Sequence, residues 1–182
     1  MDLDHLHALA DSLRLAQHAD DLAGAIYSLT EAAILDGSNA HHRAAEWVRS
    51  LHRYELFWRE RGRAPREKTS ARATLDADER HLGEWARYQR RHQHRLNSYQ
   101  RARLEVSPAF EWDPREAEWR RTFDAIRNHA CTYGELPRLN RDDPTEFALA
   151  RWLGRQLRLL QRGALTDSRA QLIHELLRRN WD

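Results

Sequence analysis

Cysteine, lysine and long apolar runs are almost or wholly missing from this chain of 182 residues. Cys131 is the only cysteine, so no disulfide can form within the chain, and we expect a reducing, cytoplasmic location. No apolar run approaches the roughly 18 residues of a membrane span. The acidic N-terminal sequence also lacks the positive region of a secretory signal. These absences predict a protein that has no membrane partner.

Motifs of catalysis and metal binding are missing as well. The sequence contains no Gly-x-x-x-x-Gly-Lys-[Ser/Thr] phosphate loop, and Lys68, the one lysine among thirty basic residues, has no glycine beside it. The eleven histidines show none of the Cys/His spacings of a zinc site. Cys131 is interpreted as a small buried apolar residue. We therefore expect no enzymatic activity, no metal site and no cofactor.

Tryptophan, in contrast, is abundant and recurs at regular spacings. Six of the seven tryptophans form pairs separated by 72, 67 and 69 residues, namely Trp47 and Trp119, Trp85 and Trp152, and Trp112 and Trp181. A leucine and a glutamine recur with the same 67-residue spacing, as Leu82 and Leu149, and as Gln89 and Gln156. Self-similarity of this kind indicates one structural unit that is used twice.

Apolar residues recur at helical spacing along most of the chain, and no segment alternates in the manner of a strand. We therefore expect an all-α protein, with an N-terminal helical pair in residues 1–43 and tandem three-helix repeats in residues 44–113 and 114–182. Gly62 is expected to end the first helix of the first repeat, and Asp76 to begin the second helix in a capping box with Glu79.

The two equivalent glutamines, Gln89 and Gln156, are polar residues on inward helix faces. A buried amide must find hydrogen-bond partners, and we expect these in the turn or in the closing tryptophan segment. The alternative is that these glutamines read an adenine edge. The tryptophans share helix faces with leucine and isoleucine, so we expect them to pack in the core rather than stack on bases.

The two copies resemble the helicase-associated domain, a family that occurs as tandem copies at the end of some bacterial helicases and in free-standing proteins. Residues 82–90 read LGEWARYQR, close to the family's Leu-Gly-x-Trp-x-x-x-Gln-Arg motif. Residues 149–157 read LARWLGRQL, with Ala150 and Leu157 where the motif has Gly and Arg. The resemblance covers residues 44–182 and implies a small three-helix fold with a nucleic-acid-binding role.

Arginine supplies nearly all the positive charge, and its distribution is uneven. Residues 1–46 carry eight acidic residues against Arg14 and Arg43, a balance of −6, so the remaining 136 residues carry +8. Arginines that face away from the core positions form two rows, Arg80, Arg87, Arg91 and Arg95 in the first repeat and Arg151, Arg155, Arg158 and Arg162 in the second. Arg90 is a further candidate beside the first row. Such rows suit a phosphate backbone, although most charged helix faces are only solvated.

We therefore expect a non-catalytic accessory protein that binds nucleic acid, DNA ahead of RNA, through these arginine-rich faces. The alternative is a protein-interaction adaptor or regulator that docks a helicase or another partner through residues 1–43 or a Trp-rich groove. Two roles are open for residues 1–43. Their acidic side chains would compete with phosphate for the arginines, or their two leucine stripes would pack on a second copy or a partner protein.

Overall fold

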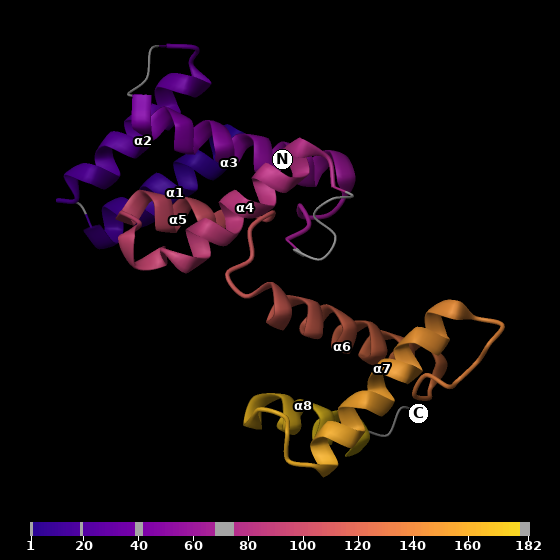
Figure 1. The fold of residues 1–182 in the computed structure, drawn as a ribbon. Helices are drawn as coiled ribbons and strands as arrows, with labels where there is room; N and C mark the ends of the chain where they lie inside the picture. The colour runs from indigo at the N-terminus through magenta and orange to yellow at the C-terminus, as the bar shows by residue number, and fades with distance from the viewer. Residues whose placement is uncertain (1, 19, 39–41, 68–74, 179–182) are drawn as a thin grey trace. The chain divides into compact units, whose positions relative to one another are not determined.

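The computed structural model describes residues 2–18, 20–38, 42–67 and 75–178, and its regular structure in these ranges is helical, with no strand. It consists of eight α-helices and a short 3-10 helix, η2 (Figure 1). The expected all-α class is confirmed. None of the helices in the described part of the chain is long and apolar enough to cross a membrane.

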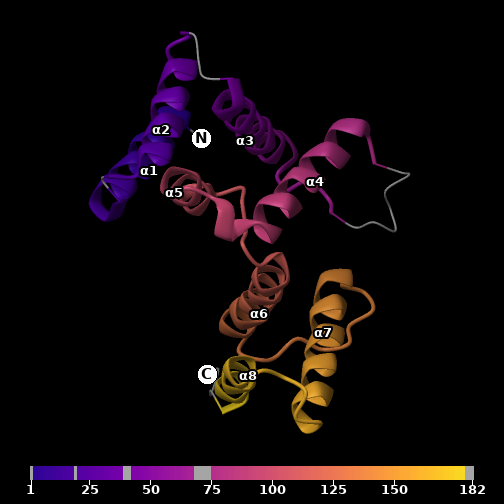
Figure 2. The same ribbon diagram turned by 60° about the vertical axis from the view of Figure 1, so that its left-hand side comes forward.

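The chain divides into two compact units, which we call unit 1 (Met1–Trp112) and unit 2 (Asp113–Asp182). Unit 1 contains α1 (Leu3–His18), α2 (Leu22–Leu35), α3 (His42–Arg61), α4 (Ala77–Arg91), η2 (Gln93–Arg95) and α5 (Ser98–Val106). Unit 2 contains α6 (Pro114–Tyr133), α7 (Pro144–Gln161) and α8 (Asp167–Arg178). The two helices of the segment that the sequence sets apart, α1 and α2, pack within unit 1, because both lie against α5, and α2 also lies against α3 (Figure 2).

An aromatic core joins α3, α4 and the segment after α5. Trp47, Leu51 and Tyr54 follow one another at helical spacing on α3, and all three are buried. They form one cluster with Leu82 of α4 and with Phe110. The tryptophan interpretation is therefore confirmed for Trp47, whose ring is only 8% exposed.

A second core in unit 1 is charged and joins α2, α3 and α5. The Arg103 guanidinium donates to both carboxylate oxygens of Glu55 at 2.7 and 2.9 Å, and to Glu31 at 3.1 Å. These three side chains are fully buried. Tyr99 and His52 donate to Glu31 at 2.8 and 2.7 Å. Buried charges are tolerated only when they are paired and hydrogen-bonded in this way.

The charged core determines which side of α2 faces inward. Glu31 bonds to side chains of α3 and α5, and Ser28 donates to Asp11 of α1 at 2.6 Å, so the polar side of α2 is the buried side. The apolar stripe of α2 consequently faces solvent, where Leu22 is 75% and Leu29 is 71% exposed.

Unit 2 has a smaller core, which is mainly apolar. Its buried cluster comprises Trp119, Phe123 and Ile126 of α6, Leu153 of α7, and Ile173 and Leu176 of α8. Two indole rings of this unit, Trp119 and Trp152, lie 5.5 Å apart at 53°. In unit 1 the rings of Trp47 and Trp85 lie 6.2 Å apart at 52°, a closely similar arrangement.

The helix ends follow local signals in the sequence. Gly62 and Gly134 have positive φ values of 64° and 71° where α3 and α6 end, a conformation that glycine adopts without strain. Asp76 and Asp143 accept hydrogen bonds from backbone amides in the first turns of α4 and α7. The predicted helix stop at Gly62 and the predicted start at Asp76 are confirmed.

Trp112 and Cys131 differ in their burial. Trp112 is half-buried and packs edge-on against Phe110, with ring centroids 5.1 Å apart. Trp181 lies outside the described residues. The interpretation of Cys131 as buried is wrong, because its side chain is exposed. It follows the buried Ile126 by five residues, which turns it about 140° away from the core of α6.

Candidate nucleic-acid interface

Four arginines form a line along the outer side of α7, which we call the α7 stripe. Arg151, Arg155, Arg158 and Arg162 follow one another at intervals of four, three and four residues, and all are exposed. At 100° per residue they occupy a sector of about 60° opposite the buried Leu153. The stripe is about 16 Å long, which is close to the rise of five base-pair steps, about 17 Å.

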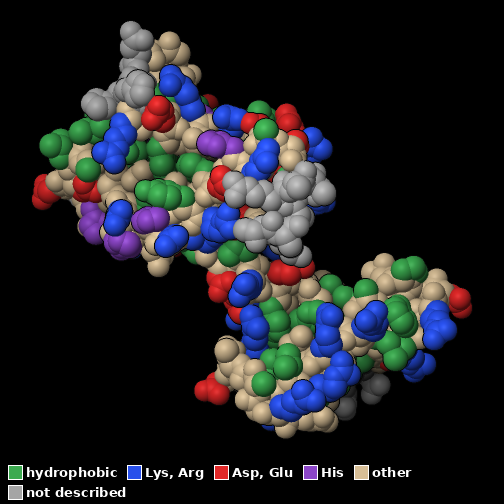
Figure 3. Space-filling view, viewed as in Figure 1, with side chains coloured by type: hydrophobic (Ala, Val, Ile, Leu, Met, Phe, Trp, Pro, Cys, Tyr) green, Lys and Arg blue, Asp and Glu red, His purple; other side chains and the backbone are tan. Residues whose placement is uncertain are grey.

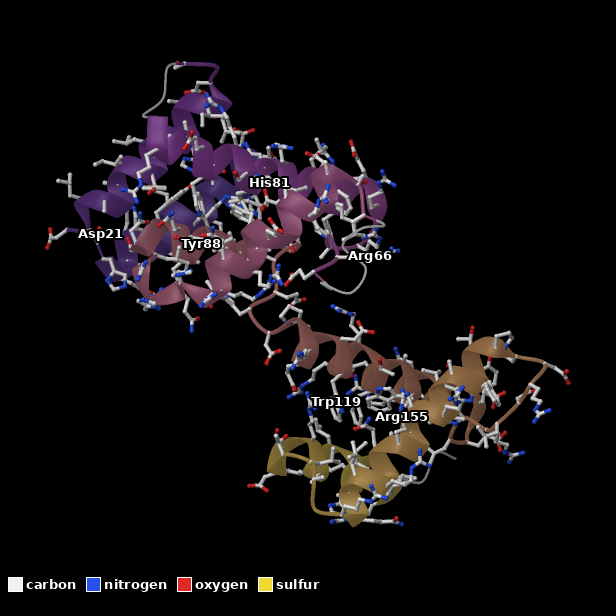
Figure 4. The ribbon with its side chains drawn as sticks, in the orientation of Figure 1. Asp21, Arg66, His81, Tyr88, Trp119 and Arg155 are labelled. Carbon is white, nitrogen blue, oxygen red and sulfur yellow. The ribbon has the colours of Figure 1, made fainter. Side chains whose placement is uncertain are left out.

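No carboxylate of the described residues neutralises the charge of the α7 stripe. Residues 147–166 contain these four arginines and no acidic residue. Within the described ranges none of the four makes an ion pair, and Arg151 lies over the ring of Phe147 at 5.8 Å. Figure 3 shows basic side chains gathered over α7, and Figure 4 labels Arg155 among them.

Five other arginines of unit 2 are paired with carboxylates, and the exposed Arg115, Arg141 and Arg178 are not among them. These pairs join Arg120 and Arg169 to Glu116, Arg121 to Glu118, Arg127 to Asp124, and Arg138 to Glu135. The hydrogen bonds from Arg169 and Arg120 hold the pKa of Glu116 below its usual value, although its partial burial opposes this. The α7 stripe therefore differs from these paired arginines, because its four side chains are regularly spaced and make no ion pair among the described residues.

A buried hydrogen bond fixes α7, and further hydrogen bonds join it to the loop that precedes it. Trp119 Nε1 donates to Gln156 Oε1 at 3.0 Å. Glu146, in the first turn of α7, accepts from the backbone N–H of Arg138 at 2.9 Å and from the Asn140 side chain at 3.0 Å. These donors hold the pKa of Glu146 below its ordinary value. The stripe is thus presented by a helix whose orientation and preceding loop are both constrained.

Unit 1 makes the same two kinds of contact. Trp47 Nε1 donates to Gln89 Oε1 at 3.1 Å, and Glu79 accepts from the backbone N–H of Arg66 at 2.9 Å. Arg63 donates to both oxygens of Glu79 at 2.6 and 3.2 Å and lowers its pKa. Glu79 therefore does not complete the expected capping box, because its carboxylate turns to the preceding loop.

Both glutamines bond to a residue that was not predicted from the sequence. We expected Gln89 and Gln156 to bond to the turn or to the closing tryptophan; no such bond of Gln89 is present among the described residues, and Trp181, the closing tryptophan of unit 2, lies outside them. Each amide oxygen instead accepts from the opening tryptophan of its own unit, Trp47 or Trp119. Both glutamines are buried, at 4% and 7% exposure, so they present no edge that could read a base.

The row of unit 1 is less regular than the α7 stripe. Arg95 belongs to η2, beyond the end of α4. Glu84 takes the position equivalent to Arg151, and Tyr88 the position equivalent to Arg155. Both departures are visible in the sequence once the copies are aligned at the 67-residue spacing. The exposed Arg87 and Arg91 of α4 therefore have an acidic residue on their own helix face.

Arg90 contacts the protein itself. Its guanidinium pairs with Glu67, donates to the backbone carbonyl of Glu111 at 2.8 Å and lies over the Phe110 ring at 5.2 Å. The side chain is only 13% exposed. These partners lie 23 and 21 residues away in the chain, so helical spacing alone could not identify them. Arg90 is therefore not part of the candidate interface, contrary to the sequence prediction.

An aromatic pair that was not predicted from the sequence lies beside the arginines of α4. The rings of Tyr88 and His92 stack with centroids 4.2 Å apart and an interplanar angle of 28°. Tyr88 is 56% exposed and lies on the outer surface of α4 (Figure 4). Its position on the helix face away from Leu82 is the signal that could have revealed it. Exposed rings flanked by arginine can stack on unpaired bases.

Among the described residues, no group of three or more His, Cys, Asp or Glu side chains could hold a metal ion. The chain matches no known protein family, no curated protein and no solved structure. The functional interpretation therefore depends on the geometry and charge of the two units.

Proposed function

We propose that this chain is a non-catalytic accessory protein that binds the phosphate backbone of nucleic acid, DNA ahead of RNA, through the α7 stripe. The observation that carries the proposal is a line of four exposed arginines with no ion pair in the described structure and no acidic residue in residues 147–166. Residues 82–90 and 149–157 also resemble the Leu-Gly-x-Trp-x-x-x-Gln-Arg motif of the helicase-associated domain, and this motif resemblance agrees with the same function although no family model matches the chain.

The spacing of the stripe suits a polyanion. Neighbouring arginines are about 4.5–6 Å apart along the helix axis, a separation that lets each guanidinium meet a different phosphate on a flexible side chain. Arginine binds phosphate in a bidentate manner and keeps its charge at all physiological pH values. Arg87, Arg91 and Arg95 add a second, weaker contact surface in unit 1, with Tyr88 available for an unpaired base.

The proposal is tested by replacing Arg151, Arg155 and Arg158 together with Gln. Affinity for a short DNA duplex should fall at least tenfold at low salt, and the log–log salt slope should become less steep by about 2.7, or about 0.9 for each lost phosphate contact. Fluorescence anisotropy over a salt series measures both quantities. Circular dichroism checks that the helices are retained.

The matched control removes three charges from paired arginines of the same unit. Replacing Arg120, Arg121 and Arg127 with Gln changes the net charge equally, but these side chains are bound to Glu116, Glu118 and Asp124. We expect this variant to keep its affinity within about threefold of the wild type. Equal losses in the two variants would mean that only net charge matters, and undetectable binding by the wild type at low salt would contradict the proposed function.

A second candidate, the protein-interaction adaptor, is favoured by a different observation. The second helix of the acidic pair, α2, buries its polar side and leaves its own apolar stripe in solvent. That surface lies in unit 1 and does not involve the α7 stripe, so the two functions are compatible in one chain.

A further inference from the structure

The exposed side of α2 is an unpartnered apolar stripe. Leu22, Ile26 and Leu29 are 75%, 38% and 71% exposed, and their spacing of four and three residues aligns them along one helix face. Hydrophobic side chains gather over this part of unit 1 in Figure 3. Single exposed leucines are ordinary, but a helical line of them is typical of a protein-binding surface.

Rotation of α2 cannot bury this stripe without breaking the charged core. The opposite side of α2 carries Glu31, which is fully buried and bonded to Arg103, Tyr99 and His52. Turning α2 to bury Leu29 would bring Glu31 into solvent and leave Arg103 with fewer partners. The stripe is therefore a permanent surface of the folded unit.

Acidic residues lie at both ends of the stripe. Asp20 precedes Leu22 by two residues, Asp36 follows Leu29 by seven, and both are exposed. The sequence from residue 15 to residue 42 contains no lysine or arginine, and Arg14 is buried and paired with Asp11 at 2.9 Å. An apolar line with negative charge at each end favours a ligand of the complementary pattern.

We propose that this surface, Leu22, Ile26 and Leu29 with Asp20 and Asp36 at its ends, docks an amphipathic helix of a partner protein that carries Lys or Arg beyond both ends of its apolar face. A helix is the fitting occupant, because residues at i, i+4 and i+7 form a ridge that packs into the groove of another helix. This inference does not depend on the nucleic-acid proposal.

Charge argues against a second copy of this chain as the occupant. An antiparallel pair of α2 helices would bring Asp20 of each copy close to Asp36 of the other. A parallel pair would bring Asp20 to Asp20 and Asp36 to Asp36. Like charges meet in either case, and such contacts weaken association.

The test is a selection from a library of displayed helical peptides on the full-length chain. Each peptide has leucine at i, i+4 and i+7 and randomised positions at both ends. Counter-selection uses the Leu22→Asp, Leu29→Asp double variant. We expect enrichment of Lys and Arg at the two ends of the selected peptides.

A selected peptide should bind the wild type at least tenfold more tightly than the Leu22→Asp, Leu29→Asp variant. The charge reversal Asp20→Lys, Asp36→Lys should weaken its binding by a similar factor and strengthen binding of a peptide with glutamate ends. Leu139→Asp, at a leucine of unit 2 that is 66% exposed, is the control and should bind as the wild type does. Melting temperatures of all variants should match, because the changed side chains already face solvent.

Three results would overturn the inference. The selected peptides could be no more basic at their ends than the library, or their affinity could be unaffected by the α2 variants. Sedimentation could also show a dimer of the wild type that the Leu22→Asp, Leu29→Asp variant loses, which would make a second copy the occupant. A failure of the chain to bind DNA would leave this inference unaffected.

Discussion

Unit 1 and unit 2 share their local contacts but differ in what their cores contain. In each unit a tryptophan, Trp47 or Trp119, donates to a buried glutamine. In each unit a glutamate in the first turn of α4 or α7 accepts a hydrogen bond from the backbone of the preceding loop. Unit 1 adds a buried guanidinium with two carboxylates, whereas the buried cluster of unit 2 is apolar.

The two kinds of core determine in different ways which face of a helix is buried. Apolar packing in unit 2 selects the face of α7 that carries Leu153 and Gln156, as helical periodicity predicts. Directional ion pairs in unit 1 select the polar face of α2, against the periodicity of its leucines. The consequence is that each unit presents a different surface, an arginine stripe in unit 2 and an apolar stripe in unit 1.

The largest expected difference between the units comes from their charged residues. Arg103→Met leaves Glu31 and Glu55 buried without their cation and should lower the unfolding free energy of unit 1 by about 3–5 kcal/mol. Arg169→Met in unit 2 breaks a half-exposed pair with Glu116 and should cost at most about 1–2 kcal/mol. Hydrogen exchange of each unit measures both effects. A cost below about 1 kcal/mol for Arg103→Met would contradict the charged core.

The tryptophan–glutamine bonds should contribute equally in the two units. Gln89→Leu and Gln156→Leu each leave a buried indole N–H without an acceptor, at a cost of about 1–3 kcal/mol. Urea denaturation followed by tryptophan fluorescence measures the loss, with the exposed Gln161→Leu as a control that should stay within about 0.5 kcal/mol. A clear inequality between the first two variants would break the equivalence of the units.

Two glycines should respond to alanine with opposite signs. A Cβ at Gly83 would lie 2.5 Å from the backbone oxygen of Arg66, so Gly83→Ala should destabilise unit 1 by about 1–3 kcal/mol. At Gly154 the nearest atom is 4.0 Å away, on the Arg158 side chain, so Gly154→Ala should stabilise α7 by about 0.5–1 kcal/mol. Thermal melts of both variants test the prediction, and stabilisation by Gly83→Ala would show that the loop can move.

A further effect appears only at acid pH. Donors of Ser98 and the Gly24 amide lower the pKa of Asp21 from 3.8 to about 2. Because the folded-state pKa is the lower one, the stabilisation is present above about pH 4 and is lost as the pH falls toward 2. After allowance for solvent screening we expect about 1–2 kcal/mol. The difference in stability between wild type and Asp21→Asn should disappear near pH 2, and a constant difference would contradict the assignment.

Much of the candidate interface could be predicted from the sequence, because the α7 stripe follows from helical spacing alone. Arg151, Arg155, Arg158 and Arg162 were all expected on the outer face and are exposed there. Arg90 could not be excluded in the same way, since its partners Glu67 and Glu111 lie on other segments. The binding of nucleic acid by these residues stays a prediction.

The sequence by itself determined the helices and their ends, because capping and periodicity act over a few residues. Gly62 and Asp76 mark helix ends in the sequence and occupy them in the structure. Only the tertiary structure decided which side of α2 faces inward. The partner of Glu31 that fixes this, Arg103, lies 72 residues further along the chain, and the requirement to pair a buried charge outweighs the burial of Leu22 and Leu29.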